Sequence, residues 1–334
     1  MMPYRLQQAA KRVGKELAIA RGMLHWDTHG LSGTVLLAGS GRSGTTWMSQ
    51  IIHHGGAYRD LFEPFHPQQV RQMKDWHAMR YLRANQGKNE STEQIRALLE
   101  GRVRSRWTDQ YNRKTFPQGR LIKAIRTNLM LGWINNHCPE VKLLFAMRHP
   151  CAVVHSRVKL QWDTHLDQLL AQPGLVRDHL EPYRGVIERA ERSQDPWQKH
   201  LAMWCIENLI PLRELSQGDA HLLRYEDLCQ DFDGEVARLF TFLDRPVPNN
   251  IHNIARQRSA HFRRDSAILQ GGDLIADWQK QVEPKHIDAM LDMLSCFGLN
   301  HLYDERAMPR CQRDGVFIDP SLSASPISIH KDAA

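Results

Sequence analysis

The sequence has no apolar run long enough to cross a membrane, because no stretch of about 18 consecutive apolar residues occurs in it. Its first residues also lack the apolar core of a signal peptide. The six cysteines are widely spaced, without a CxxC pair or a Cys/His cluster, which indicates a reduced compartment and no structural zinc. We therefore expect a cytoplasmic protein without a metal site.

Acidic residues are the scarcer charge: 37 Asp and Glu stand against 44 Lys and Arg, a formal net charge of +7. This surplus suits an anionic partner such as a nucleotide, a nucleic acid, an acidic glycan or a membrane surface. The basic residues form no continuous stripe, so we expect no nucleic acid partner. Hydrophobic residues make up 42% of the 334 residues, enough for a large core.

Residues 1–30 are predicted to form an amphipathic helix. Apolar residues recur there at spacings of four and three, at Leu6, Ala10, Val13, Leu17, Ala20 and Leu24, with arginines and lysines between them. Three partners for the apolar face stay open: the protein's own domain, a second subunit of a homodimer, and a membrane surface.

A phosphate-binding unit is predicted near the start of the main domain. Residues 34–38 form a short apolar run with the composition of a strand, a glycine-rich loop follows at 39–44, and 45–53 has the pattern of a helix. A strand, a glycine loop and a helix in this order present backbone amides to a phosphate group.

Further strands and helices alternate along the chain. Strands are predicted at 121–125, 141–147 and 221–225, and helices at 92–101, 127–137, 151–160, 197–216 and 232–243. This alternation predicts a P-loop-like α/β fold of three layers, a central parallel sheet with helices on both faces, over residues 31–304. Residues 161–196 are polar and interrupted by prolines, so we expect a mobile helical lid that contributes little core. Residues 305–334 are expected to be an irregular tail.

The glycine loop lacks the lysine of a nucleoside triphosphatase. Gly39, Gly44 and Thr46 fit the pattern GxxxxGK[ST], but Thr45 stands at the lysine position. That lysine contacts the β- and γ-phosphates, so its absence argues against the alternative of a P-loop nucleotide kinase or other phosphotransferase. The basic residue lies inside the loop instead, at Arg42, where a guanidinium can bind an anion with two parallel hydrogen bonds.

The string from Gly41 to Trp47, Gly-Arg-Ser-Gly-Thr-Thr-Trp, resembles the loop that binds the 5′-phosphosulfate in sulfotransferases dependent on 3′-phosphoadenosine 5′-phosphosulfate (PAPS). The resemblance implies that PAPS is the donor and that the phosphosulfate is bound by Arg42, Ser43, Gly44, Thr45 and Thr46. It also implies that Trp47 stacks on the adenine, with plain helix packing as the alternative explanation.

A second string about 105 residues later, Arg148 to Arg157, resembles the 3′-phosphate motif of the same family. The resemblance implies that Arg148 and Ser156 bind the 3′-phosphate and, through the sequence LRYEDL at 223–228, that Tyr225 lies near the adenine. Arg263 and Arg264 match more loosely. They are candidate 3′-phosphate ligands or part of a solvated basic face.

The catalytic base is predicted to be Glu63. Cytosolic animal sulfotransferases use a histidine two residues beyond the strand lysine, whereas this chain has Lys123 followed by Ile125. Carbohydrate and protein-tyrosine sulfotransferases carry a glutamate where Glu63 stands, and we expect Pro64 to hold it in an extended conformation. His53, His54 and His66 remain outside candidates.

The resemblance, closest to carbohydrate sulfotransferases of bacterial type, implies transfer of a sulfuryl group to a hydroxyl of a glycan, glycolipid or natural product. Glu63 would take the proton of the acceptor. Lys123 and Arg42 would stabilise the negative charge that develops on the departing phosphate, with no metal required. The acceptor itself is not specified by the sequence.

Overall fold

The computed structural model describes residues 4–54, 56–253, 273–311 and 316–317. At its centre is a five-stranded sheet in which every neighbouring pair is parallel, in the order β2-β3-β1-β4-β5. The strands are β1 (Thr34–Gly39), β2 (Arg59–Phe62), β3 (Arg120–Ala124), β4 (Lys142–Met147) and β5 (His221–Arg224). Every residue of β1 and β3 is buried, as expected for strands covered on both faces.

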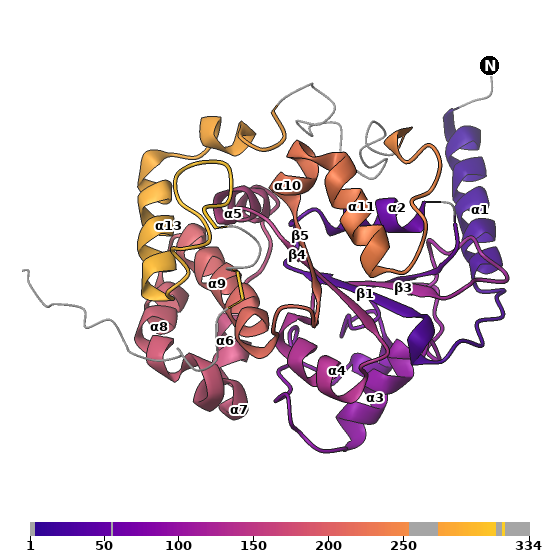
Figure 1. Ribbon diagram of the computed structural model, residues 1–334, viewed down its shortest axis with the longest axis horizontal. Helices are drawn as coiled ribbons and strands as arrows, with labels where there is room; N and C mark the ends of the chain where they lie inside the picture. The colour runs from indigo at the N-terminus through magenta and orange to yellow at the C-terminus, as the bar shows by residue number, and fades with distance from the viewer. Residues whose placement is uncertain (1–3, 55, 254–272, 312–315, 318–334) are drawn as a thin grey trace, which may run out of the picture.

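Helices cover the two faces of the sheet, and alternate strand residues belong to two hydrophobic cores. Leu36 packs on one face with α3 (Glu90–Leu99), α4 (Leu131–His137) and α9 (Pro196–Glu214), whereas Leu37 packs on the other with α2 (Thr45–His53) and α11 (Phe232–Phe242). Figure 1 shows α2 and α11 above the sheet and α3 and α4 below it. The predicted three-layer α/β fold is therefore confirmed.

The remaining elements extend this framework. The other α-helices are α1 (Tyr4–Gly22), α5 (Pro150–Lys159), α6 (Leu166–Leu170), α7 (Pro173–Leu175), α8 (Arg184–Arg192), α10 (Tyr225–Gln230) and α13 (Pro284–Cys296). Short turns of tighter or wider helix lie at Leu31–Gly33, Arg71–Met73, Asn128–Met130, Val176–Leu180, Glu181–Tyr183 and Asp277–Lys280. No helix of the described residues has both the length and the apolar character needed to span a membrane.

The expectation that residues 161–196 contribute little core is wrong. Leu166, Leu169, Leu175, Leu180 and Ile187 are all buried in the core that includes α9. The apolar residues of this segment lie on several short helices that change direction, so no single helical period runs through the sequence and the charged residues between them dominate the pattern. The function of the segment as a lid remains a prediction.

The apolar face of α1 does not pack on the protein's own domain at the positions whose side chains are described. Val13 and Leu17 are 58% and 66% exposed, and Leu24, which follows the end of α1, is 64% exposed, whereas Ile19 is buried. Of the three partners considered from the sequence, this arrangement disfavours the protein's own domain. It leaves a second subunit or a membrane surface open.

A buried ionic network, which no sequence pattern indicated, lies at the amino-terminal end of the sheet. The fully buried Arg59 on β2 and Arg120 on β3 share the carboxylate of Asp27, which accepts hydrogen bonds from Arg120 at 2.7 and 2.9 Å and from Arg59 at 3.3 Å. Asp109 binds Arg59 from the other side at 2.9 Å. These pairs attach the segment after α1 to the edge of the sheet.

We predict that Asp27→Asn lowers the free energy of unfolding by about 3 kcal/mol or more, because two buried guanidinium groups lose their shared charge. Burial alone would raise the pKa of Asp27, but the hydrogen bonds and charges of Arg120 and Arg59 outweigh it and lower the pKa. The contribution of Asp27 is therefore present at neutral pH and lost in acid, as the pH falls through the lowered pKa. Urea unfolding at neutral and acidic pH should show the difference between wild type and variant shrinking in acid.

The matched control for this experiment is Asp244→Asn. Asp244 pairs with Lys142 at the surface, and its side chain is 83% exposed. Exposed ion pairs contribute about 0–1 kcal/mol, so this variant should unfold almost like the wild type. Equal effects of the two substitutions would contradict the role assigned to the buried network.

Candidate active site

The predicted site residues lie at one edge of the sheet, where the parallel strands end. The phosphate loop follows β1, Glu63 follows β2, Lys123 is near the end of β3, Arg148 follows β4, and Tyr225 follows β5. Ligands of open parallel sheets bind at this carboxyl edge. Segments that are far apart in the sequence therefore meet there because the sheet aligns the ends of its strands.

The loop between β1 and α2 is a compact turn. The hydroxyl and the amide of Ser43 both donate to the carbonyl of Ser40, at 2.6 and 3.1 Å. Gly44 has a φ of 90° and directly precedes α2, and a Cβ at this position would lie 2.5 Å from the ring of Tyr225. Only glycine fits here, and the first-turn amides of Thr45 and Thr46 point out of the helix end, as anion binding requires.

Two arginines from separate motifs converge on the loop. Arg42 donates from Nε to the hydroxyl of Ser156 at 2.9 Å, which joins the loop to α5. Arg148 donates to the carbonyl of Arg42 at 3.5 Å, and its guanidinium lies 4.0 Å from the centroid of the Tyr225 ring. Burial, together with the charges of Arg148 and Arg157, lowers the pKa of Arg42. Such a cluster of like charges is stabilised when an anion binds to it.

Glu63 is 3% exposed and accepts hydrogen bonds at both carboxylate oxygens. Oε1 is 2.9 Å from Nζ of Lys123, while Oε2 accepts from the amide of Ile125 at 3.1 Å and from Arg126 at 3.4 Å. Lys123 also lies 4.4 Å from the centroid of the Phe62 ring. The carboxylate and the strand lysine are therefore direct partners.

The predicted extended conformation of Glu63 is wrong. Its φ is +43°, in the left-handed region, and Arg42 likewise has a φ of +77°. Such conformations cost non-glycine residues about 1–3 kcal/mol and cluster at functional sites. A following proline restricts the backbone of Glu63 but does not exclude the left-handed region. The amide of Glu63 donates to the carbonyl of Lys123 at 2.9 Å, which attaches Glu63 to the end of β3.

The predicted adenine contacts, Trp47 and Tyr225, are both buried. Trp47 is 3% exposed, and its ring packs against Phe232 and Tyr225 with centroid distances of 6.2 and 5.7 Å. Stacking of Trp47 on adenine therefore remains a prediction beside the packing role that the structure shows. Arg263 and Arg264 lie outside the described residues.

Sequence reasoning assigned no role to two residues that support the loop. Arg157 donates to the carbonyl of Gly41 at 3.1 Å and pairs with the buried Glu207 at 2.7 Å. The ring of Trp162 lies 2.5 Å from where a Cβ of Gly41 would be, so it covers the loop from outside. Arg157 is the last residue of the second motif, so a role for it could have been predicted from that motif. Trp162 lies outside both motifs, and no sequence pattern indicates its position.

His149, also within the second motif, has a structural position. Its Nε2 lies 2.9 Å from the carbonyl of Asp304, so Nε2 carries the proton and Nδ1 accepts from the amide of Cys151. Its own amide donates to the buried carboxylate of Glu226 at 2.8 Å. Burial lowers the pKa of His149 to about 4, so this neutral side chain fixes the turn that carries Arg148.

A family model described as the sulfotransferase family matches residues 35–249, a range that runs from the second residue of β1 to beyond α11. The chain belongs to the sulfotransferase family. No curated protein gives a significant match to this sulfotransferase sequence.

Solved sulfotransferase structures also resemble the chain at low identity. The sulfotransferase domain from the curacin biosynthetic pathway is 15% identical, with 78% of this chain and 97% of that chain covered and a TM-score of 0.44. Sulfotransferase STF9 from Mycobacterium avium is 15% identical over 78% and 75%, with a TM-score of 0.39. Mouse sulfotransferase SULT7A1, solved with PAP, is 12% identical over 83% and 88%, with a TM-score of 0.40.

Proposed function

We propose that this sulfotransferase-family protein moves the sulfuryl group of PAPS to a hydroxyl of an acceptor, with Glu63 as general base. The observation that carries the proposal is the hydrogen bond between Arg42 and Ser156, because it joins the phosphate loop to the helix of the second motif. The Glu63–Lys123 pair lies at the same edge of the sheet. Anion ligands and a candidate base thus come from consecutive strand ends.

The residues present fit a nucleotide with phosphates at both ends. Nε of Arg148 is buried and has no hydrogen-bond partner among the described residues, so this side chain retains a donor for a ligand. Gly44 lets the loop pack directly against the ring of Tyr225, because a Cβ there would lie 2.5 Å from that ring. We assign Arg42, Ser43, Thr45 and Thr46 to the phosphosulfate, and Arg148 and Ser156 to the 3′-phosphate.

PAPS supplies an activated sulfuryl group whose leaving group is the 5′-phosphate of the nucleotide. In this proposal Arg42 and Lys123 stabilise the negative charge that develops as that phosphate departs, and such preorganised charge is usually the largest catalytic contribution. Glu63 holds Lys123 in place through Oε1. Its carboxylate takes the proton of the acceptor hydroxyl, a step worth about 10²–10⁴-fold in rate.

The acceptor proposed is a glycan, a glycolipid or another hydroxyl-bearing natural product. Glu63 followed by Pro64, together with Lys123 and Arg126 on and after β3, supports the carbohydrate type over the phenol and steroid type. All six cysteines are free thiols, and three of them are buried. This supports a reduced compartment, and we propose the cytoplasm as the location.

Nucleotide binding gives a direct test of the donor. We predict that the purified protein binds adenosine 3′,5′-bisphosphate in isothermal titration calorimetry and that an excess of Mg-ATP does not displace it, because Thr45 replaces the P-loop lysine. Displacement by Mg-ATP, together with weak binding of the bisphosphate, would instead support the nucleotide kinase alternative.

A further inference from the structure

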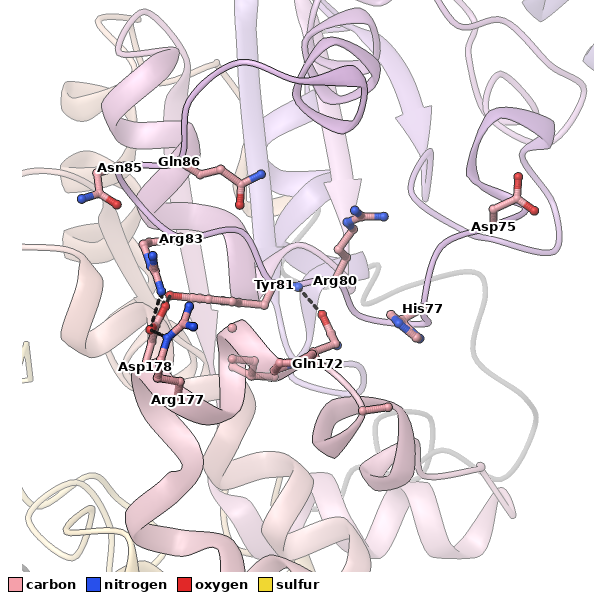
Figure 2. Close-up of a pocket in the computed structure, with 14 residues that line it drawn as sticks. Asp75, His77, Arg80, Tyr81, Arg83, Asn85, Gln86, Gln172, Arg177 and Asp178 are labelled. Carbon is pink, nitrogen blue, oxygen red and sulfur yellow. Dashed lines mark hydrogen bonds and ion pairs between the residues drawn. The ribbon is translucent and has the colours of Figure 1, made fainter.

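A cavity of about 480 Å³ lies between two segments that belong to different parts of the chain. One wall is formed by residues 75–86 of the loop after β2, and the other by residues 171–178, around α7. Figure 2 shows that the labelled side chains around it are polar and that arginines project from both walls. Its volume lies within the range of about 300–1,000 Å³ that is usual for small-molecule sites.

Side-chain amides fix the two walls to each other. The carboxamide oxygen of Gln172 accepts from the amide of Tyr81 at 2.9 Å (Figure 2). Its NH2 group donates to the carbonyl of Met79, also at 2.9 Å. Gln168 accepts from the amide of Ala78 at 2.9 Å. Because these bonds replace the backbone pairing that the loop lacks there, the cavity is formed before any ligand arrives.

At one end of the cavity, Arg83 and Arg177 already have a carboxylate partner, Asp178. Asp178 accepts two hydrogen bonds from Arg83, at 2.7 and 2.6 Å, and a third from the hydroxyl of Tyr81 at 3.1 Å. Arg177 donates to the same carboxylate at 3.3 Å. The carboxylate of Asp178 therefore pairs with two guanidinium groups. The bidentate contact with Arg83 is stronger than the contact with Arg177.

Arg80 is the cavity arginine without a carboxylate partner among the described residues. Its guanidinium lies 4.9 Å from the centroid of the Trp76 ring, and Figure 2 shows it directed away from the Arg83–Asp178 pair. Partial burial lowers its pKa. A guanidinium that has lost part of its hydration without gaining a counter-charge is stabilised by an anionic ligand.

Both walls of the cavity lead back to the proposed active site. The loop that carries Arg80 begins at Glu63, and the segment that carries Gln172 begins near Trp162, whose ring covers Gly41 of the phosphate loop. The cavity and the proposed active site are therefore joined by two continuous segments of the chain.

We propose that this cavity binds the anionic group of an acidic sugar, a carboxylate or a sulfate, with Arg80 as its principal ligand. The planar guanidinium matches both groups, because each presents two oxygens to a pair of parallel N–H donors. Arg80 is a specificity residue in this assignment, outside the sulfuryl transfer step. The identification of the ligand as part of the acceptor rests on the proposed function.

The experiment compares three related sugars that differ in one group: p-nitrophenyl β-D-glucoside, its sulfate ester and p-nitrophenyl β-D-glucuronide. Each is titrated calorimetrically into wild type, Arg80→Gln and Arg71→Gln, all saturated with adenosine 3′,5′-bisphosphate. We expect wild type to bind one or both of the charged sugars about tenfold or more tightly than the neutral glucoside, and Arg80→Gln to lose that preference. The tighter of the two charged sugars identifies the carboxylate or the sulfate as the natural group.

Arg71→Gln is the matched control, because Arg71 lies exposed on the same loop and outside the cavity. It should keep the full preference. If Arg80→Gln unfolds at a lower temperature than wild type, Arg80→Lys keeps the charge without the planar fork and should retain a reduced preference. A wild type without preference, or a preference unchanged in Arg80→Gln, would overturn the assignment.

These outcomes separate the cavity from the proposed function. Binding of acidic sugars that depends on Arg80, in a protein that transfers no sulfuryl group, would contradict the function and keep the site. Sulfuryl transfer with equal KM values for neutral and acidic sugars in wild type would contradict the site and keep the function.

Discussion

Glu63→Gln should lower turnover by about 10²-fold or more while the affinity for adenosine 3′,5′-bisphosphate stays nearly unchanged. Glutamine has the size of glutamate, and its single carboxamide oxygen can still accept from Lys123 or from Ile125, but it cannot take the proton of the acceptor. The measurement is single-turnover transfer from labelled PAPS, with nucleotide affinity determined separately by calorimetry.

A purely structural role for Glu63 predicts a different pattern. The pair with Lys123 is buried, so removing its charge would then lower the melting temperature and weaken every ligand together. Glu93→Gln, on the exposed face of α3, is the control for loss of a carboxylate. It should leave both turnover and melting temperature unchanged. Near-normal turnover in well-folded Glu63→Gln would contradict the assignment and direct attention to His66 and His53.

Arg148→Ala should weaken binding of adenosine 3′,5′-bisphosphate by about 30-fold or more and leave binding of adenosine 5′-monophosphate almost unchanged. The loss corresponds to about 2–4 kcal/mol for a charge-assisted contact in a partly buried site. We expect the effect to be confined to the nucleotide with a 3′-phosphate, because that phosphate is assigned to Arg148. Arg148 lies on the turn before α5, and its buried Nε has no partner among the described residues. Calorimetric titration of the two nucleotides measures the effect.

Arg42→Ala provides the contrast to Arg148→Ala. Arg42 is assigned to the other end of the nucleotide, so its loss should weaken both nucleotides by similar factors. Arg148 also packs on Tyr225, and a merely structural role would make its substitution behave in the same way as Arg42→Ala. A preference for the 3′-phosphate that survives Arg148→Ala would show that the second motif is misassigned.

The strands that the sequence predicted are those buried on both faces. Four short segments rich in apolar residues predicted β1, β3, β4 and β5 to within about two residues at each end. The fifth strand, β2, was missed because it has four residues and begins with Arg59 and Asp60. Arg59 is tolerated there only because Asp27 and Asp109 neutralise it, and both partners lie far away in the sequence.

The local motifs predicted which site residues come together, and the structure adds how they are held. Arg42, Arg148 and Ser156 could be placed because each follows a recognisable strand or lies on the helix after it. The left-handed backbone of Glu63 and the support of Gly41 by Arg157 depend on contacts across the sheet, which spacing does not encode. The buried leucines of 166–180 were likewise concealed by the changes of direction between short helices.

Transfer of label from sulfur-labelled PAPS to a hydroxyl acceptor is the measurement that tests the central claim most directly. The purified protein is incubated with labelled PAPS and a panel of glycans, glycolipids and other hydroxyl compounds, without added metal or ATP. We predict that label appears on at least one acceptor and that Glu63→Gln abolishes most of this transfer. A wild-type protein that binds the nucleotide but leaves all label on it across the panel, or one that requires Mg-ATP to act, would contradict the account.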